Sequence, residues 1–160
     1  MKDLLPLAEK IGALLKQRKE TIAIAESSSG GLIAAALLSV PGASAYFVGG
    51  VVTYTRKSMQ ELVGLNEESF KGMRGLTEAT ALILARGARE RLGATWGISE
   101  IGAAGPTGSR YGDAAGTTAI AVVGPGGERA ARIQTGSADR VANMRAFADA
   151  ALRLFEECLK

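Results

Sequence analysis

The sequence contains no histidine and a single cysteine, Cys158, among 160 residues. Because these two residue types are the usual protein ligands of zinc, haem and iron–sulfur clusters, we expect no metal site. The same absence excludes Ser-His-Asp and Cys-His catalysis, which leaves Lys, Asp, Glu or Tyr as a general base. One cysteine cannot form an internal disulfide, which fits a reducing compartment.

Aromatic residues and concentrated charge are also scarce. Aromatics make up 5% of the sequence and the formal net charge is +3, with the basic residues scattered along the chain. Nucleic-acid surfaces need clustered Lys and Arg with interleaved aromatic side chains. No apolar stretch approaches the roughly 20 residues that span a bilayer, and the N-terminus lacks the apolar run of a signal peptide. We therefore expect a cytoplasmic protein that binds neither nucleic acid nor membranes.

The sequence does contain enough apolar residues, 47%, to bury the core of one domain. We find no internal repeat or interdomain linker, so residues 1–160 are expected to form a single domain. Apolar spacing predicts helices over 3–18, 30–40, 56–63, 77–92 and 137–159 and strands over 21–25, 47–54, 96–102, 117–123 and 129–135. The turn signal in 125–127 predicts a hairpin of the last two strands. This pattern predicts a three-layer α/β/α sandwich with a mixed sheet.

Two glycine-containing loops follow predicted strands. The first contains Glu26, three serines and Gly30-Gly31, and the second contains Gly102, Gly105 and Gly108. Because ligands of open α/β sheets bind beyond the carboxyl ends of the strands, we expect both loops at the same edge of the sheet. Taken separately, each loop is more often a plain turn than a site. The second loop has neither the spacing of a dinucleotide fingerprint nor a Walker pattern.

Five motifs together resemble the CinA C-terminal domain family, the nicotinamide-nucleotide amidohydrolases. They are Ala25-Glu-Ser-Ser-Ser-Gly-Gly31, Pro41–Tyr54, Gly102-Ala-Ala-Gly-Pro106, Gly116-Thr117 and Thr135-Gly-Ser-Ala-Asp-Arg140. The resemblance spans about residues 5–157 in a single order. It implies a three-layer α/β domain that self-associates, without metal or covalent cofactor. It also implies hydrolysis of nicotinamide mononucleotide to nicotinate mononucleotide and ammonia, a step of the pyridine nucleotide cycle.

The resemblance also implies catalytic residues. The family motif is Ala-Glu-Ser-Cys-Thr-Gly-Gly, whose first hydroxyl residue is the nucleophile, and Ser27 occupies that position. A family tyrosine and lysine in the order Thr-Tyr-x-x-x-x-Lys assist it, and Tyr54 matches the tyrosine. Met59 stands where the lysine is expected, and the nearest lysine is Lys57. A shift of two residues on a helix rotates a side chain by roughly 200°, so Lys57 would begin on the opposite face. Lys71 is a second candidate amine.

The substrate-binding residues are also carried over from the resemblance. Arg140 falls on the arginine of the family's Gly-Asp-Arg stretch, although two residues are inserted before it, and Arg145 is a second phosphate candidate. Glu26 orients Ser27 or a ribose, or else stabilises a helix start through its dipole. The predicted binding residues are Glu26, Ser28, Ser29, Gly30, Gly31, Gly102, Ala103, Ala104, Gly105, Pro106, Arg140 and Arg145.

Three functional hypotheses remain open from the sequence. The first is an amidohydrolase in which Ser27 attacks, Tyr54 assists and backbone N–H groups near residues 28–30 stabilise the oxyanion. The second is a pyridine-nucleotide-binding module that has lost catalysis with the lysine. The third keeps the scaffold for another substrate and uses Arg110 and Tyr111 of the altered second loop. In each case the expected partners are a small molecule and further copies of the chain, as a homodimer or higher homo-oligomer.

Overall fold

The computed structural model describes residues 1–160 and is built around one five-stranded sheet. The strand order is β2-β1-β3-β4-β5. β1 pairs in parallel with both β2 and β3, whereas β3–β4 and β4–β5 are antiparallel pairs. The strands are β1 (Ile22–Glu26), β2 (Phe47–Val52), β3 (Trp96–Ala103), β4 (Thr117–Gly124) and β5 (Gly127–Gln134). The sheet is therefore mixed, and the predicted hairpin is β4–β5.

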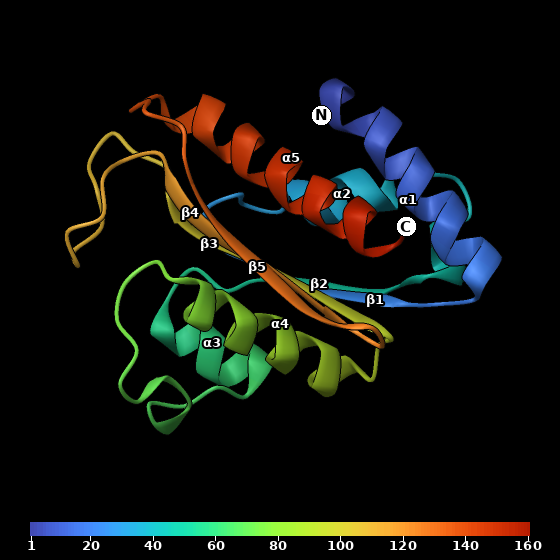
Figure 1. Cartoon of the computed structure of the whole chain (residues 1–160), viewed down its shortest axis with the longest axis horizontal. Coiled ribbons are helices and arrows are strands. Elements are labelled where there is room, and N and C mark those ends of the chain that lie inside the picture. The colour runs from blue at the N-terminus through green and yellow to red at the C-terminus, as the bar shows by residue number, and fades with distance from the viewer.

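Helices cover both faces of the sheet, which confirms the three-layer prediction (Figure 1). One layer contains α1 (Leu5–Arg18), α2 (Leu32–Leu38) and α5 (Arg140–Cys158). The other contains α3 (Arg56–Val63) and α4 (Glu78–Leu92). Single 3-10 turns occupy Lys2–Leu4, Ala43–Ala45 and Glu68–Phe70. None of the helices combines the length and the apolar character needed to span a membrane.

All ten predicted helices and strands exist, with several ends shifted by one to three residues, and two of these shifts have clear local causes. The helix predicted from residue 30 begins at Leu32, because Gly30 and Gly31 adopt φ values of 67° and 96° in the preceding turn. The helix predicted from residue 137 begins at Arg140, because the Asp139 side chain accepts the N–H of Ala142 and caps it.

The two helical layers bury unequal cores. A cluster of 23 buried residues fills the space between the sheet and α1, α2 and α5. The α3 and α4 side has two smaller clusters, of eight and five residues, with many alanines. Met59 and Phe70 belong to the eight-residue cluster, beside the edge where β1, β2 and β3 end and the β3–β4 loop extends beyond the sheet (Figure 1). This edge carries the site described below.

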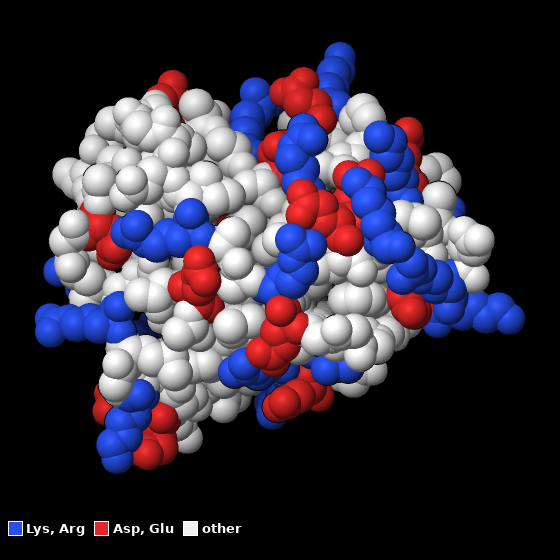
Figure 2. Space-filling view, in the orientation of Figure 1, with Lys and Arg blue, Asp and Glu red and all other residues white.

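Charges of both signs alternate on the face shown in Figure 2. The ion pairs of the structure include Arg86 with Glu128, and Arg129, which lies 3.2 Å from Glu157. These pairs tie α4 to β5 and β5 to α5. Because they are solvent-exposed, they contribute little to stability.

Candidate active site

The turn after β1 is held in place by a buried glutamate of β3. Glu100 Oε2 accepts the backbone N–H groups of Ser27 and Ser29 at 3.1 and 2.8 Å, and Oε1 accepts the hydroxyls of Ser28 and Thr118. Glu100 is fully buried, and each of these four groups donates a hydrogen bond to its carboxyl. A buried carboxyl inside the fold therefore fixes the backbone on both sides of Ser27. The parallel pairing of β1 with β3 confirms that the two predicted loops follow strand ends at the same edge of the sheet.

Glu26, the last residue of β1, is also fully buried. Its carboxyl accepts the N–H groups of Ile33 and Ala34 in the first turn of α2, so it satisfies helix donors, as its alternative interpretation predicted. Ser29 Oγ lies 2.6 Å from Glu26 Oε2 and 2.8 Å from Glu100 Oε2. One hydroxyl carries one proton, so both contacts are hydrogen bonds only when a carboxyl is protonated. Burial raises the pKa of Glu26.

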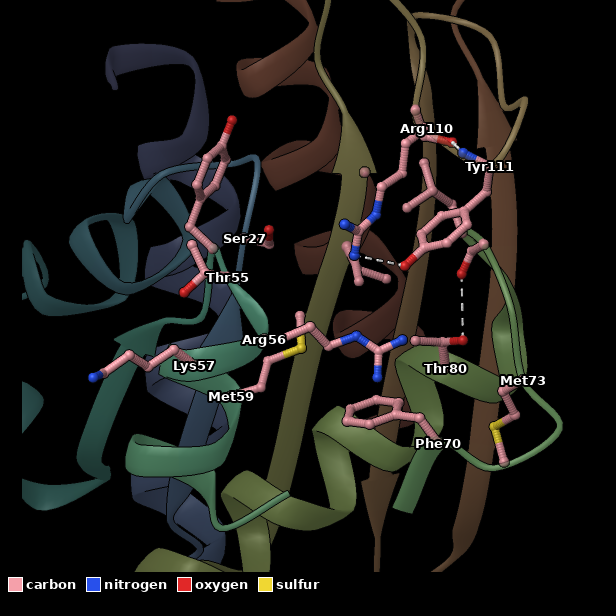
Figure 3. A pocket seen from close by; sticks show the side chains of 16 residues that line it. Ser27, Thr55, Arg56, Lys57, Met59, Phe70, Met73, Thr80, Arg110 and Tyr111 are labelled. Carbon is pink, nitrogen blue, oxygen red and sulfur yellow. Dashed lines mark hydrogen bonds between the residues drawn. The ribbon is translucent and has the colours of Figure 1, made fainter. Parts of the chain in front are cut away.

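Ser27 lines a cavity of about 600 Å³ (Figure 3). Ser27 Oγ makes no hydrogen bond within the protein, although the residue is only 6% exposed. Basic groups and an apolar wall surround it, and no aspartate or glutamate contributes to the lining. The lining residues, drawn in Figure 3, are Ser27, Tyr54, Thr55, Arg56, Lys57, Met59, Phe70, Met73, Gly75, Leu76, Thr80, Ile101, Gly102, Ser109, Arg110 and Tyr111.

The residue at the position of the family lysine, Met59, and the two candidate lysines, Lys57 and Lys71, lie in different places. Met59 is buried and lines the cavity, so the position of the family lysine does face Ser27's cavity. Lys57 also contributes to the wall, but its side chain extends away from Ser27 (Figure 3). Lys71 is exposed and lies 3.5 Å from Glu68, with no place in the lining. No lysine amine is hydrogen-bonded to Ser27.

Tyr54 lines the cavity at its rim and is 60% exposed. Its hydroxyl accepts a hydrogen bond from Arg140 at 3.2 Å, and Arg140 also donates to the carbonyl of Gly105 at 2.6 Å. Asn143 of α5 donates to the carbonyl of Ala104 at 2.7 Å. The start of α5 therefore holds both Tyr54 and the loop after β3, and Arg140 donates a hydrogen bond to each of them.

Of the predicted site residues, the structure brings Ser27, Tyr54, Lys57 and Gly102 to the cavity. Ser28 and Ser29 instead face the two buried carboxylates, and the N–H of Gly30 is bonded to the carbonyl of Ser27. The remaining predicted residues of the two loops, Glu26, Gly31, Ala103, Ala104, Gly105 and Pro106, do not line it. Arg145 lies elsewhere, in a separate pocket with Met1, Asp3, Leu4, Ala146 and Asp149.

Sequence reasoning missed Glu100 and Arg56. A signal for Glu100 exists, because it is the only charged residue in the otherwise apolar and small-residue strand β3. An ionisable group in a buried strand needs dedicated partners, and the serines of the first loop are those partners. Arg56 gives no such signal, since basic residues at a helix start on the surface are common. No group of three His, Cys, Asp or Glu side chains that would hold a metal ion occurs in the structure.

Comparison with known proteins agrees with this geometry. The family model of the CinA C-terminal domain matches residues 4–159. The chain belongs to the CinA C-terminal domain family. A CinA-like protein of Chloroherpeton thalassium is 40% identical over 158 residues, covering 97% of this chain and 38% of that protein. A CinA-like protein of Prochlorococcus marinus is 41% identical over 130 residues, covering 81% and 30% respectively. The chain thus spans about a third of the length of these CinA relatives.

Solved structures of the CinA superfamily have the same fold. The competence/damage inducible protein CihA of Agrobacterium tumefaciens superposes with a TM-score of 0.90 at 28% identity, covering 99% of this chain and 96% of that one. A CinA superfamily protein of Klebsiella pneumoniae gives a TM-score of 0.90 at 26% identity, covering 98% and 97%. The shared fold therefore extends over the whole length of both CinA chains.

Proposed function

We propose that this chain is an amidohydrolase that converts nicotinamide mononucleotide to nicotinate mononucleotide and ammonia. Ser27 Oγ attacks the carboxamide carbon, the proton of Ser27 passes to the leaving nitrogen, and ammonia departs to leave an acyl ester on Ser27. Water then hydrolyses that ester and restores the hydroxyl. The N–H of Ser28, which has no acceptor within the protein, is positioned in the same turn to stabilise the oxyanion.

The observation that carries this proposal is the free hydroxyl of Ser27 in a turn whose other two serine hydroxyls are hydrogen-bonded. Ser28 and Ser29 use their hydroxyls inside the protein, whereas Ser27 Oγ has no protein partner and faces the cavity. The cavity is within the size range of small-molecule sites and combines an apolar wall with basic groups. Membership of the CinA family adds support, since its amidohydrolases use the serine at this position.

The missing lysine sets the expected rate. Positioned general bases contribute about 10² to 10⁴ in rate, and no side chain is hydrogen-bonded to the hydroxyl of Ser27. Tyr54 lies at the rim, where Arg140 donates to its hydroxyl. The proposed enzyme therefore turns over slowly compared with relatives that have the lysine.

The test is to measure ammonia release and binding with the same preparation of folded wild-type protein. Nicotinamide mononucleotide is supplied at millimolar concentration, ammonia is followed by a coupled assay, and binding is measured by calorimetric titration. Release of ammonia above a protein-free blank is the expected result. Folded protein that releases no ammonia contradicts the amidohydrolase proposal for this substrate.

A second candidate function, a nucleotide-binding protein without turnover, is favoured by Met59 in the lining. Binding of nicotinamide mononucleotide without ammonia release would select this second function. Absence of both binding and ammonia release contradicts both candidates and would mean that the cavity takes another substrate.

A further inference from the structure

Two arginines lie against Tyr111, and a third, Arg56, lines the same cavity as Tyr111. Arg110 Nη2 donates to the Tyr111 hydroxyl at 2.9 Å, and its guanidinium carbon lies 5.0 Å from the centre of that ring. The guanidinium of Arg74 lies 5.7 Å from the same ring. Arg56 extends from the start of α3 over the ring of Phe70, at 4.7 Å, with its guanidinium toward the middle of the cavity (Figure 3). These side chains come from three separate segments of the chain.

None of these arginines has a carboxylate partner. The six ion pairs of the structure involve other residues, and the cavity lining contains no acidic side chain. The nearest carboxylate in the sequence, Asp113, is bonded to Arg132 at 3.0 Å and to the hydroxyl of Ser109. The positive charge inside the cavity is therefore not neutralised by the protein.

The Tyr111 hydroxyl completes a set of donors. It accepts from Arg110, while its own proton has no acceptor within the protein. The guanidinium groups of Arg56 and Arg110 lower the pKa of Tyr111, as cations near a phenol hydroxyl do. Two guanidinium forks and one hydroxyl suit an anion with three oxygens, because Arg matches phosphate geometry with paired N–H groups.

We propose that Arg56, Arg110 and the hydroxyl of Tyr111 form a subsite for the phosphate monoester of the ligand in the Ser27 cavity. This inference rests on the proposed function, which identifies the rest of the ligand. In the proposed complex, the ring of the ligand lies along the apolar wall of Phe70, Leu76 and Ile101. It differs from the sequence prediction, which gave the phosphate to Arg140 or Arg145. Arg140 instead holds Gly105 and Tyr54, and Arg145 lies in a separate pocket.

The first experiment compares two ligands that differ only in the phosphate. Binding of nicotinamide mononucleotide and of nicotinamide riboside is measured by calorimetry for wild type, Arg56→Met and Arg110→Met. The control is Arg145→Met, which removes the same charge away from the cavity. We expect each cavity variant to weaken mononucleotide binding at least tenfold and to leave riboside binding within twofold, with the control unchanged. Equal losses for both ligands, or an equal loss in the control, would overturn the subsite.

The second experiment separates failure of the subsite from failure of the proposed function. Inorganic phosphate is titrated into each protein at constant ionic strength, and backbone amide shifts are followed by NMR. We expect phosphate to shift the amides of residues 109–112 in wild type and in Arg145→Met, and to shift them weakly in Arg56→Met and Arg110→Met. If ammonia release fails while these shifts occur, the hydrolase proposal is wrong and the subsite stands. If wild type shows no such shifts, the subsite is wrong regardless of activity.

Discussion

At the residue scale, the proposed site keeps the serine of the family motif and lacks its lysine. Ser27 is the one hydroxyl of its turn that the protein leaves free, while Met59 occupies the wall where the family has a lysine. Lys57 does not substitute for that lysine, because its side chain extends away from Ser27 (Figure 3). The chemistry of the site is therefore limited by the supply of a base.

The substitution Met59→Lys should raise ammonia release from nicotinamide mononucleotide by about 10²-fold, because it places an amine in the cavity. Burial and the nearby guanidinium groups would lower the pKa of that amine and keep it neutral, as a base requires. The measurement is kcat with circular dichroism as a check of folding. Met59→Leu is the matched control and Lys57→Met tests the outward lysine, and both should leave kcat unchanged. A folded Met59→Lys protein without a gain contradicts this account of the missing base.

At the element scale, the turn after β1 depends on a neighbouring strand. Hydrophobic periodicity located every helix and strand, and the strand-end rule placed the two loops together. Periodicity did not predict the contacts between the turn after β1 and strand β3. The partners of the buried Glu100 depend on the register of β1 against β3, in which Ala25 is opposite Ser99. The sequence also did not show that the start of α5 holds the loop after β3 through Asn143 and Arg140.

The contacts of Glu100 lead to a prediction with a matched pair of variants. Glu100→Leu removes the acceptor of two buried N–H groups and should reduce the free energy of unfolding by about 3 kcal/mol, from about 1–3 kcal/mol for each unsatisfied donor. Glu100→Gln keeps an oxygen for the N–H groups of Ser27 and Ser29 and turns an NH₂ toward Ser28 and Thr118. It should stay within about 1 kcal/mol of wild type. Urea unfolding checks both values, and equal losses in the two variants would show that the charge, not the hydrogen bonds, holds the turn.

At the scale of the whole molecule, global stability depends on a buried acid. The pKa of Glu26 is raised by burial, so between its unfolded pKa and its folded pKa the native chain binds one more proton than the unfolded chain. This contribution to stability is fully present below the unfolded pKa and is lost as the pH rises through the folded pKa. Asp113 and Glu128 act in a lower pH range, because hydrogen bonds and ion pairs lower their pKa values.

The free energy of unfolding should therefore fall as the pH rises above about 4.5, with a slope of at most about 1.4 kcal/mol per pH unit for one proton. Glu26→Gln should start from a lower stability, because one N–H of α2 loses its acceptor, and should lack this slope. Urea unfolding at fixed protein concentration and stepped pH checks both. The same slope in Glu26→Gln and wild type would assign the pH dependence to another group.

The central claim is that Ser27 attacks the carboxamide, and the most direct measurement is ammonia release by Ser27→Ala beside wild type. The substitution removes only the hydroxyl that the protein leaves unbonded, so the fold and the binding of nicotinamide mononucleotide should be retained. The account predicts that ammonia release falls to the level of the protein-free blank while calorimetric affinity stays within about threefold. Ammonia release by Ser27→Ala at the wild-type rate would contradict it.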